Sequence, residues 1–421
     1  MIVGWVALWG ASTAIGAEWE HGGDTKAFFV TTIPYEHVWM PNDPSGQGVV
    51  SGRVFLRGRL DGFSAEAQPS WSFQAPGSAS GGMGGAGMFV QTSSGLPEAV
   101  DLSWELSDGE GLNADLRMER LWVGWSAPHV TARLGRQPVT LGVGSIFAPL
   151  DLVNPFHPTV MDQEVKPGVD SMRVDGFFGT SGRVVAVAAY VGDQPLVGNE
   201  DDECVEFTQQ ELVMAGHLQQ TFGMWDLGLF VGDVRQDWVV GLTAAGGVGP
   251  VAIRFEGTRT HPHEAAEEDP FVRAALASDW RPTLRTTLSG ELYAQTHGAQ
   301  SPDDYLEMYT HDRVMRGEMW AVGRYYGALM VLQEITPLTM GSLAFISNLE
   351  DGSAMLGPAL SISMASNAHL DLASWFGLGE RPGDPDMEAL MAGAELASVY
   401  PVNSEFGLTP TTIVMSMKMY W

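Results

Sequence analysis

The sequence contains one cysteine, Cys204, among 421 residues. A single cysteine cannot form an internal disulfide, and it excludes metal sites built mainly from cysteine thiolates. Acidic neighbours disfavour its thiolate form, so a nucleophilic role is not expected. The run His261-Pro262-His263-Glu264 offers metal ligands, but two histidines in a flexible loop seldom hold an ion. We therefore expect no metal and no cofactor.

Long apolar runs are also missing. After the first 17 residues no stretch approaches the roughly 20 apolar residues that a transmembrane helix needs. Charged residues make up only 17% of the chain, against about 25% in an average soluble protein, yet the mean hydropathy is close to zero. A β-barrel satisfies both observations, because only every second residue of its strands faces lipid.

Positive charge is scarce as well. The chain has 22 basic and 51 acidic residues, which gives a net charge of −29. Such a chain repels a phosphate backbone, so nucleic acid is excluded as a partner. The acidic residues gather at 200–206, 264–269 and 380–388. We interpret these segments as solvated loops; a cation-attracting mouth or divalent bridging to lipopolysaccharide is the alternative.

The N-terminal segment, residues 1–17, combines an apolar run with small residues before Ala17 but lacks a basic start. This pattern predicts a secretory signal peptide with cleavage near Ala17. A buried N-terminal strand or helix is the alternative. Residues 18–421 are then expected to form one domain.

The C-terminal segment alternates without interruption up to a terminal aromatic residue. One face carries Ile413, Met415, Met417, Met419 and Trp421. Period-two alternation of this kind predicts a β-strand with one apolar face. A final strand ending in an aromatic residue resembles the assembly signal of outer-membrane barrels, which implies the outer-membrane assembly machinery as a partner.

The same alternation recurs upstream, for example at 251–258 and 284–295. It predicts an all-β fold, a transmembrane antiparallel β-barrel of about 18 strands, with 16 as the alternative. A soluble β-sandwich also alternates, but here short turns alternate with long connections, as in outer-membrane barrels. Long loops are expected near 75–111, 144–167, 193–207, 298–316 and 380–408.

Several strand limits follow from this pattern. The first strand is placed at 26–40, although Pro34 weakens it, and later strands are placed at 130–143 and 317–332. A hairpin is expected around Asp61-Gly62, a dipeptide that favours tight turns. Another tight turn is expected at 281–282, and a short strand at 101–106 inside a long loop.

Three motifs follow one another within residues 118–175. They are Gly135-Arg136-Gln137, Asn154-Pro155 and Gly168-Val169-Asp170. In this order they resemble porin-like outer-membrane proteins of Gram-negative bacteria. Those proteins often carry a tryptophan and a glycine soon after the first motif, where this chain has Leu141-Gly142. The resemblance implies a porin fold in the cell outer membrane and says little about the solute.

Three arginines are expected to share one height on the lumen wall. Arg120 and Arg136 each lie eight residues from Pro128 in a predicted turn, and Arg173 lies eight residues before Ser181 in another. Side chains alternate between the two faces of a strand, and this alternation is expected to point all three arginines inward. An arginine that faced lipid near the midplane would cost about 2–4 kcal/mol. We expect a basic row along the lumen.

The loop at 144–167 carries Asp151, Asp162 and Glu164. If it folds inward, these carboxylates face the arginine row and narrow the pore, a known route to ion selectivity. An interpretation compatible with this one is that the charges form salt bridges that pin the loop to the wall.

The sequence thus predicts an outer-membrane channel for passive diffusion of small hydrophilic solutes or ions. A structural or adhesive barrel with a closed lumen is the alternative. A barrel enzyme is disfavoured, because no catalytic Ser/His or Asp/His arrangement is recognisable. The lipid bilayer and lipopolysaccharide are the expected surroundings, and the sequence is compatible with a homo-oligomer as well as a monomer.

Overall fold

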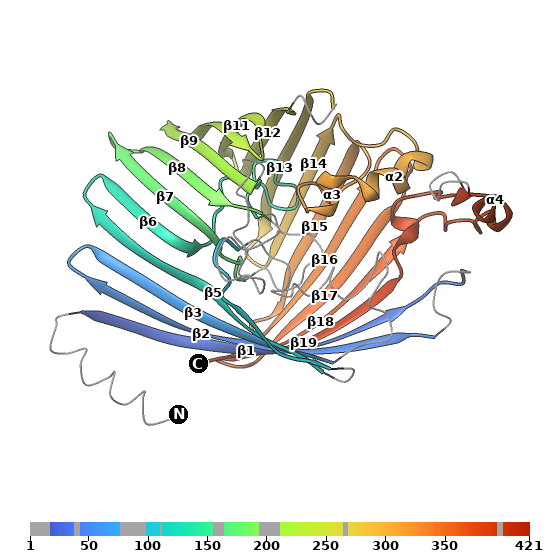
Figure 1. Ribbon diagram of the computed structural model, residues 1–421, viewed down its shortest axis with the longest axis horizontal. Helices are drawn as coiled ribbons and strands as arrows, with labels where there is room; N and C mark the ends of the chain where they lie inside the picture. The colour runs from blue at the N-terminus through green and yellow to red at the C-terminus, as the bar shows by residue number, and fades with distance from the viewer. Residues whose placement is uncertain are drawn as a thin grey trace.

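The computed structural model describes residues 17–37, 43–75, 98–109, 112–154, 164–192, 211–263, 268–393 and 399–421. They form a closed antiparallel β-barrel with 18 strands around the ring (Figure 1). The expected fold and strand count are confirmed. The predicted signal peptide, apart from Ala17, lies outside the described residues.

The ring follows the order of the chain. Its strands are β1 Glu18–Ile33, β2 Ser45–Leu60, β3 Phe63–Ala75, β5 Leu112–Ala127, β6 Val130–Gln137, β7 Val169–Phe178, β8 Gly182–Tyr190, β9 Leu212–Phe222, β10 Trp225–Val234, β11 Asp237–Val248, β12 Val251–His261, β13 Phe271–Thr283, β14 Thr286–Gln295, β15 Tyr325–Thr336, β16 Thr339–Asn348, β17 Ala354–Ala365, β18 Ala368–Leu378 and β19 Thr411–Tyr420. The ring closes where β1 pairs with β19, and the backbones of Gly23 and Trp421 extend this seam with hydrogen bonds of 2.8 and 3.0 Å.

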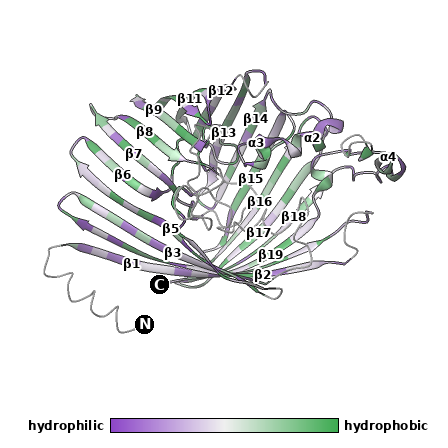
Figure 2. Cartoon of the chain, viewed as in Figure 1, coloured by the Kyte–Doolittle hydropathy of each residue, from purple (hydrophilic) through white to green (hydrophobic). Residues whose placement is uncertain are grey.

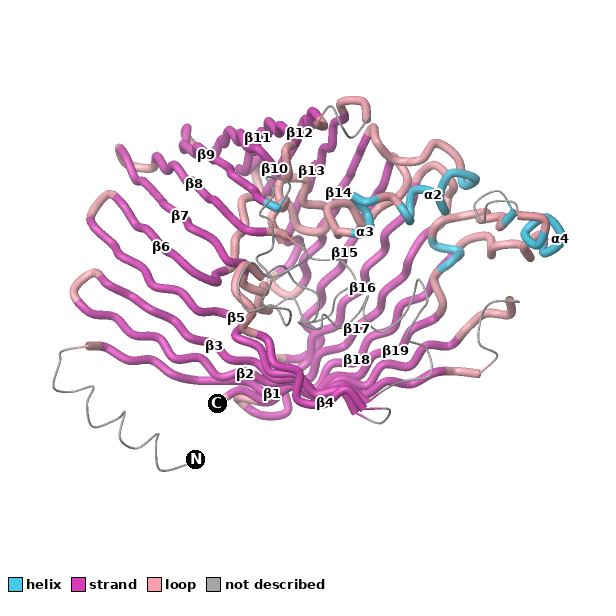
Figure 3. Tube along the Cα trace, viewed as in Figure 1, coloured by secondary structure: helices cyan, strands magenta, loops and turns pink. Residues whose placement is uncertain are grey.

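The few helices lie in the connections (Figure 3). Within the described ranges they are η5 Pro302–Asp304, α2 Tyr305–Thr310, α3 Asp312–Met315, α4 Met387–Met391 and η6 Phe406–Leu408. None of the helices in the described ranges is long and apolar enough to cross a membrane.

The two faces of the strands differ sharply in exposure. On β19 the outward residues Ile413, Met415, Met417 and Met419 are 43–48% exposed, whereas inward Val414 is fully buried. Apolar and polar residues alternate along many strands in the same way (Figure 2). The apolar faces therefore point away from the lumen, as the alternation predicted.

Strand β6 ends earlier than expected. The sequence placed its end at residue 143, but it ends at Gln137, because Pro138 has no N–H to donate to the sheet. Beyond it the chain leaves the wall. The short strand β4, Ser103–Gly109, takes up the pairing with β5 beside β6, so the strand predicted inside the 75–111 loop exists but is not part of the ring.

Three other limits differ from the prediction. The first strand is β1, which ends at Ile33 before Pro34. The chain turns at 284–285 instead of 281–282, because a register irregularity lets β13 continue through Pro282. The strand expected at 317–332 begins only at Tyr325. The apolar residues at 319–322 give the sequence pattern of a strand, but in the structure they pack inside the barrel.

The expected hairpin at Asp61-Gly62 is confirmed. Both residues have positive φ, 44° and 84°, which is the geometry of a type I′ turn. Glycine adopts this conformation at no steric cost. The turn joins β2 to β3 with Leu60 opposite Phe63, so it sets the register of the first hairpin.

Residues 138–168 connect β6 to β7, and we call this connection the inner loop; its described parts, 138–154 and 164–168, fold into the barrel. Val139, Leu141, Leu150, Leu152 and Val153 pack against inward residues of β7–β11. Leu150 is fully buried, which is worth roughly 1.5–3 kcal/mol for a side chain of this size. The described residues between Val139 and Val153 are therefore part of the core rather than a surface connection.

Candidate functional site

The inner loop is anchored to the wall of β12 and β14. The carboxylate of Glu256 accepts hydrogen bonds from the amides of Val143 (2.6 Å), Gly144 (3.0 Å) and Leu150. On β14, Glu291 accepts the amides of Ile146 and Phe147 at 3.1 and 2.7 Å. Hydrogen bonds to an ionised acceptor are roughly twice as strong as neutral ones. These two glutamates, which we call the amide anchor, hold the loop across the barrel from β6 (Figure 1).

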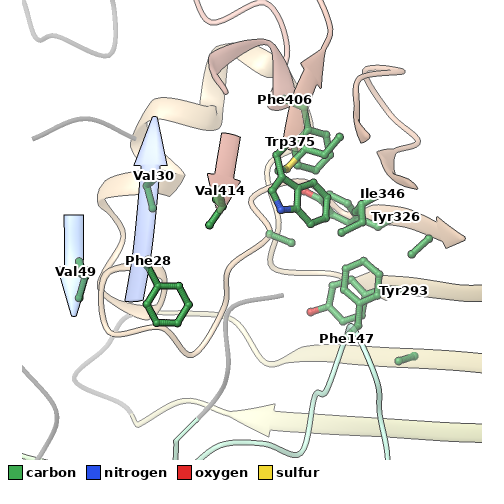
Figure 4. Packing of buried hydrophobic residues seen from close by; sticks show 14 residues of the cluster. Phe28, Val30, Val49, Phe147, Tyr293, Tyr326, Ile346, Trp375, Phe406 and Val414 are labelled. Carbon is green, nitrogen blue, oxygen red and sulfur yellow. The ribbon is translucent and has the colours of Figure 1, made fainter. Parts of the chain in front are cut away.

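Aromatic rings strengthen this anchor. Phe147 stacks on Tyr293 of β14 with ring centroids 4.6 Å apart and on Trp320 with centroids 5.1 Å apart. Figure 4 shows Phe147 and Tyr293 face to face inside the barrel. The tip of the inner loop is therefore wedged between the wall and the segment that carries Trp320.

The other end of the inner loop reaches the seam of the barrel. Glu164 lies 2.9 Å from Lys26 of β1 and 3.0 Å from Lys418 of β19, and it accepts a hydrogen bond from Tyr420 at 2.7 Å. Burial raises the pKa of Glu164, but the hydrogen bonds from Lys26, Tyr420 and Lys418 outweigh it and lower the pKa to about 2. Its side chain is still 39% exposed. The loop thus brings a charged, partly hydrated carboxylate to the seam.

The inner loop is also tied to itself. Lys166 contacts both oxygens of Asp151, at 2.5 and 2.7 Å, and the hydroxyl of Thr140 at 3.2 Å. Burial lowers the pKa of Lys166 and raises that of Asp151, so the charge on each depends on its partner. Asn154 donates to the carbonyl of Pro167. These contacts make the two ends of the loop one unit.

Arg136 lies in a closed network. It holds Asp170 through two hydrogen bonds of 3.0 and 2.8 Å, contacts Glu98 at 3.1 Å and donates to the carbonyls of Met118 and Val100. Only 1% of the residue is exposed. A side chain so enclosed positions the wall and the start of the inner loop, and it does not touch a passing ion.

Arg120 and Arg173 are less enclosed. Arg120 donates to the carbonyl of Lys166 at 3.2 Å and lies 3.7 Å from Glu66. A register irregularity in the pairing of β3 with β5 lies beside it. Arg173 is hydrogen-bonded to Asp175, at 2.8 and 3.0 Å. All three predicted arginines therefore have acidic partners, and Asp162 lies outside the described residues.

Between the inner loop and residues 317–321 lies a cavity of about 300 Å³. Its lining includes Phe147, Asp151, Glu164, Lys166, Arg273 and Glu318. Burial raises the pKa of Glu318, but Arg273, Arg313 and Arg316 outweigh it and lower the pKa to about 2. The cavity thus presents charges of both signs beside aromatic rings, a lining suited to small polar solutes.

Sequence reasoning missed the residues that hold the loop. The alternation already turned Glu256 and Glu291 inward, which was a usable signal, but nothing local identified their partners more than 100 residues away. Glu318 was missed for another reason. It lies in the segment that the sequence assigned to a strand.

Comparisons with solved structures place this architecture among known barrels. The chain is similar to OccAB4 of Acinetobacter baumannii, with a TM-score of 0.55, 9% identity and coverage of 96% of this chain and 98% of that one. It is also similar to a BenF-like porin from Pseudomonas fluorescens (TM-score 0.56, 8% identity, 96% and 99% covered) and to Pseudomonas aeruginosa OpdK with vanillate (0.53, 10%, 96% and 99%).

No protein-family model and no curated protein sequence matches the chain. Identities of 8–10% to the solved structures show a shared fold and nothing finer. The likeness spans nearly the whole of each chain, so it covers the ring and its closure together. The fold of the chain is that of an 18-stranded porin barrel.

Proposed function

We propose that this protein is an outer-membrane channel for passive diffusion of small hydrophilic solutes or ions. One observation carries the proposal: the inner loop crosses the lumen, is held by walls on both sides and borders a cavity lined by charged groups. A barrel of this size is wide enough for an aqueous path. The apolar outer face supports a location in a lipid bilayer.

The names of the structural neighbours support the same class. Two are described as a BenF-like porin and as OpdK with vanillate, which is an aromatic carboxylate. In this chain Lys166 and Arg273 could meet a carboxylate, and Phe147 offers a ring beside them. Both cations are paired with acids, however, at 2.5 Å to Asp151 and 3.6 Å to Glu318. We therefore propose a channel without strict preference for one sign of charge.

Selectivity is proposed to depend on Arg120 and Arg173 of the wall and on Asp151, Asp162 and Glu164 of the inner loop. Unit charges about 8 Å apart interact by roughly 2 kcal/mol at an effective dielectric of 20. That is enough to bias ion passage. Arg136 acts only indirectly in this proposal, because it is enclosed.

The proposed surroundings follow from the location. Acidic loop residues would face lipopolysaccharide and bind it through divalent cations, and the terminal Trp421 would serve the assembly machinery. A barrel with a closed lumen is the competing function. It shares the fold and differs only in whether solute passes the inner loop.

Swelling of liposomes separates these functions. We expect liposomes that contain the folded protein to swell in small sugars and in small charged solutes, at rates that fall as solute size increases. Liposomes without protein serve as the control. Equal rates in the two preparations would favour the closed barrel and contradict the channel.

A further inference from the structure

Two histidines and a glutamate from separate segments meet beside the long connection between β14 and β15. The ligand atoms of Glu268, His297 and His311 all lie within 4.8 Å of one another. Glu268 precedes β13, His297 follows β14, and His311 joins α2 to α3. None of these three residues lines the cavity described above.

His297 supplies the clearest observation that points to a ligand. Its Nε2 atom is buried and has no hydrogen-bond partner among the described residues. The ring packs against Phe271 and meets the His311 ring edge-on, with centroids 4.9 Å apart. Metal ions bind an imidazole through the lone pair of a ring nitrogen.

Glu268 is oriented toward the histidines by an arginine. Its Oε2 accepts a hydrogen bond from Arg313 at 2.8 Å, while its Oε1 lies 3.5 Å from Nε2 of His311. Arg313 is itself fixed by Asp237 at 2.7 Å and by Glu318 at 3.1 Å. Partners that hold a ligating carboxylate in place are a regular feature of metal sites.

We propose that Glu268, His297 and His311 bind a divalent late transition-metal ion such as Zn²⁺. Two imidazole nitrogens and one carboxylate oxygen suit Zn²⁺, and a water molecule would complete a tetrahedral shell. Hard cations such as Mg²⁺ and Ca²⁺ prefer oxygen ligands alone, so they are not expected here. The inference goes beyond the proposed transport function and replaces the expectation that the protein holds no metal.

Binding requires a small rearrangement. Metal–ligand bonds of about 2.0–2.2 Å put tetrahedral donor atoms roughly 3.4 Å apart. Donor atoms that now lie up to 4.8 Å apart must therefore approach by up to about 1.4 Å. Nδ1 of His311 now accepts the amide of Arg313 at a long 3.3 Å. A metal at Nε2 leaves the proton on Nδ1, so this contact must open. The bound ion would join the segments on either side of β13 and β14.

Zinc titration of the purified full chain in detergent tests the site, for example by competition with a chromophoric chelator. We expect one equivalent to bind to the wild type. Loss of an outer partner of a metal site costs 10–100-fold in affinity, so His297→Gln with His311→Gln should weaken binding by more than about 100-fold. His261→Gln is the matched control, because His261 is an exposed histidine at the end of β12; the zinc affinity of this variant should equal that of the wild type.

A second measurement does not depend on any variant. Co²⁺ bound to the wild type should give the intense visible bands of a four- or five-coordinate ion rather than the weak spectrum of the octahedral aqua ion. Absence of binding, an octahedral spectrum, or equal affinity in the double variant would each overturn the proposal. Binding lost in His261→Gln alone would overturn it as well. None of these readouts requires transport, so they leave the channel proposal untouched.

Discussion

Two charge clusters on the inner wall use the same chemistry in different surroundings. The Arg136 cluster, with Glu98 and Asp170, is closed: the arginine side chain is 0% exposed and its partners are 8% and 15% exposed. The Glu164 cluster, with Lys26 and Lys418, leaves its carboxylate 39% exposed. Exposure therefore decides whether an ion pair supports the wall or remains available to a passing solute.

Removal of Arg136 should have the largest effect on stability. Arg136→Ala leaves Asp170 without its arginine partner and removes one of the two arginines that contact Glu98. Breaking a buried pair in this way typically costs 3–5 kcal/mol, as an order of magnitude. We expect a clear drop in the midpoint of thermal unfolding, measured by gel mobility of the folded barrel. Arg183→Ala is the matched control, since Arg183 is 40% exposed beside Asp175 and its loss should cost less than about 1 kcal/mol. Equal midpoints for the two variants would contradict the comparison.

Loss of a glutamate of the amide anchor should have the second-largest effect. Glu256→Gln removes the charge that three loop amides share, and hydrogen bonds to charged groups exceed neutral ones by about 1 kcal/mol each. The loosened inner loop should raise single-channel conductance and current noise. Glu334→Gln is the control, because Glu334 forms only a long ion pair of 3.9 Å with Arg285 and does not contact the inner loop. A quiet current of wild-type size in Glu256→Gln would show that the loop does not need this anchor.

Glu164→Gln should change selectivity more than stability. The exchange removes one negative partner from Lys26 and one from Lys418 beside the cavity, while Lys418 keeps Asp371 at 3.4 Å. A partly exposed pair contributes at most about 1 kcal/mol, which corresponds to roughly a fivefold change in relative permeability in favour of anions. The reversal potential in a salt gradient measures this shift. Glu20→Gln on the same strand as Lys26 should not move it, and a fixed reversal potential in both variants would remove Glu164 from the selectivity proposal.

Lowering the pH should have the smallest effect on the channel, and this effect should develop gradually. The pKa of Glu164 is lowered from 4.5 to about 2, so its ionised pairs stabilise the loop above about pH 4.5. That contribution is lost as the pH falls toward about 2. Current noise of the wild type should rise over this window, and Glu164→Gln should show no such rise. An identical pH response in the variant would assign the titration to another group.

Strands and faces were predictable because period two is a local property of the chain. The run from Ile413 to Trp421 placed β19 and its apolar face correctly, and Asp61-Gly62 fixed the first hairpin. Local reasoning went wrong where local and tertiary signals disagree. Pro138 ended β6 early, and the apolar residues at 319–322 resembled a strand although they pack in clusters inside the barrel.

The site was predictable only in part. The sequence placed Arg120, Arg136 and Arg173 near the lumen and suggested an inward loop, but it could not name their partners. Contacts such as that of Glu164 with Lys418 join residues 254 positions apart, and only the inner loop within a closed barrel brings them together. The cluster of Glu268, His297 and His311 has the same origin, since three separate segments contribute to it.

Water and ions are proposed to pass beside the inner loop, and single-channel recording in a planar bilayer measures this passage. We expect discrete, stable current steps for the wild type in neutral salt, with larger and noisier steps for Glu256→Gln. A correctly folded barrel that inserts into the bilayer and passes no current, in either form, would contradict it.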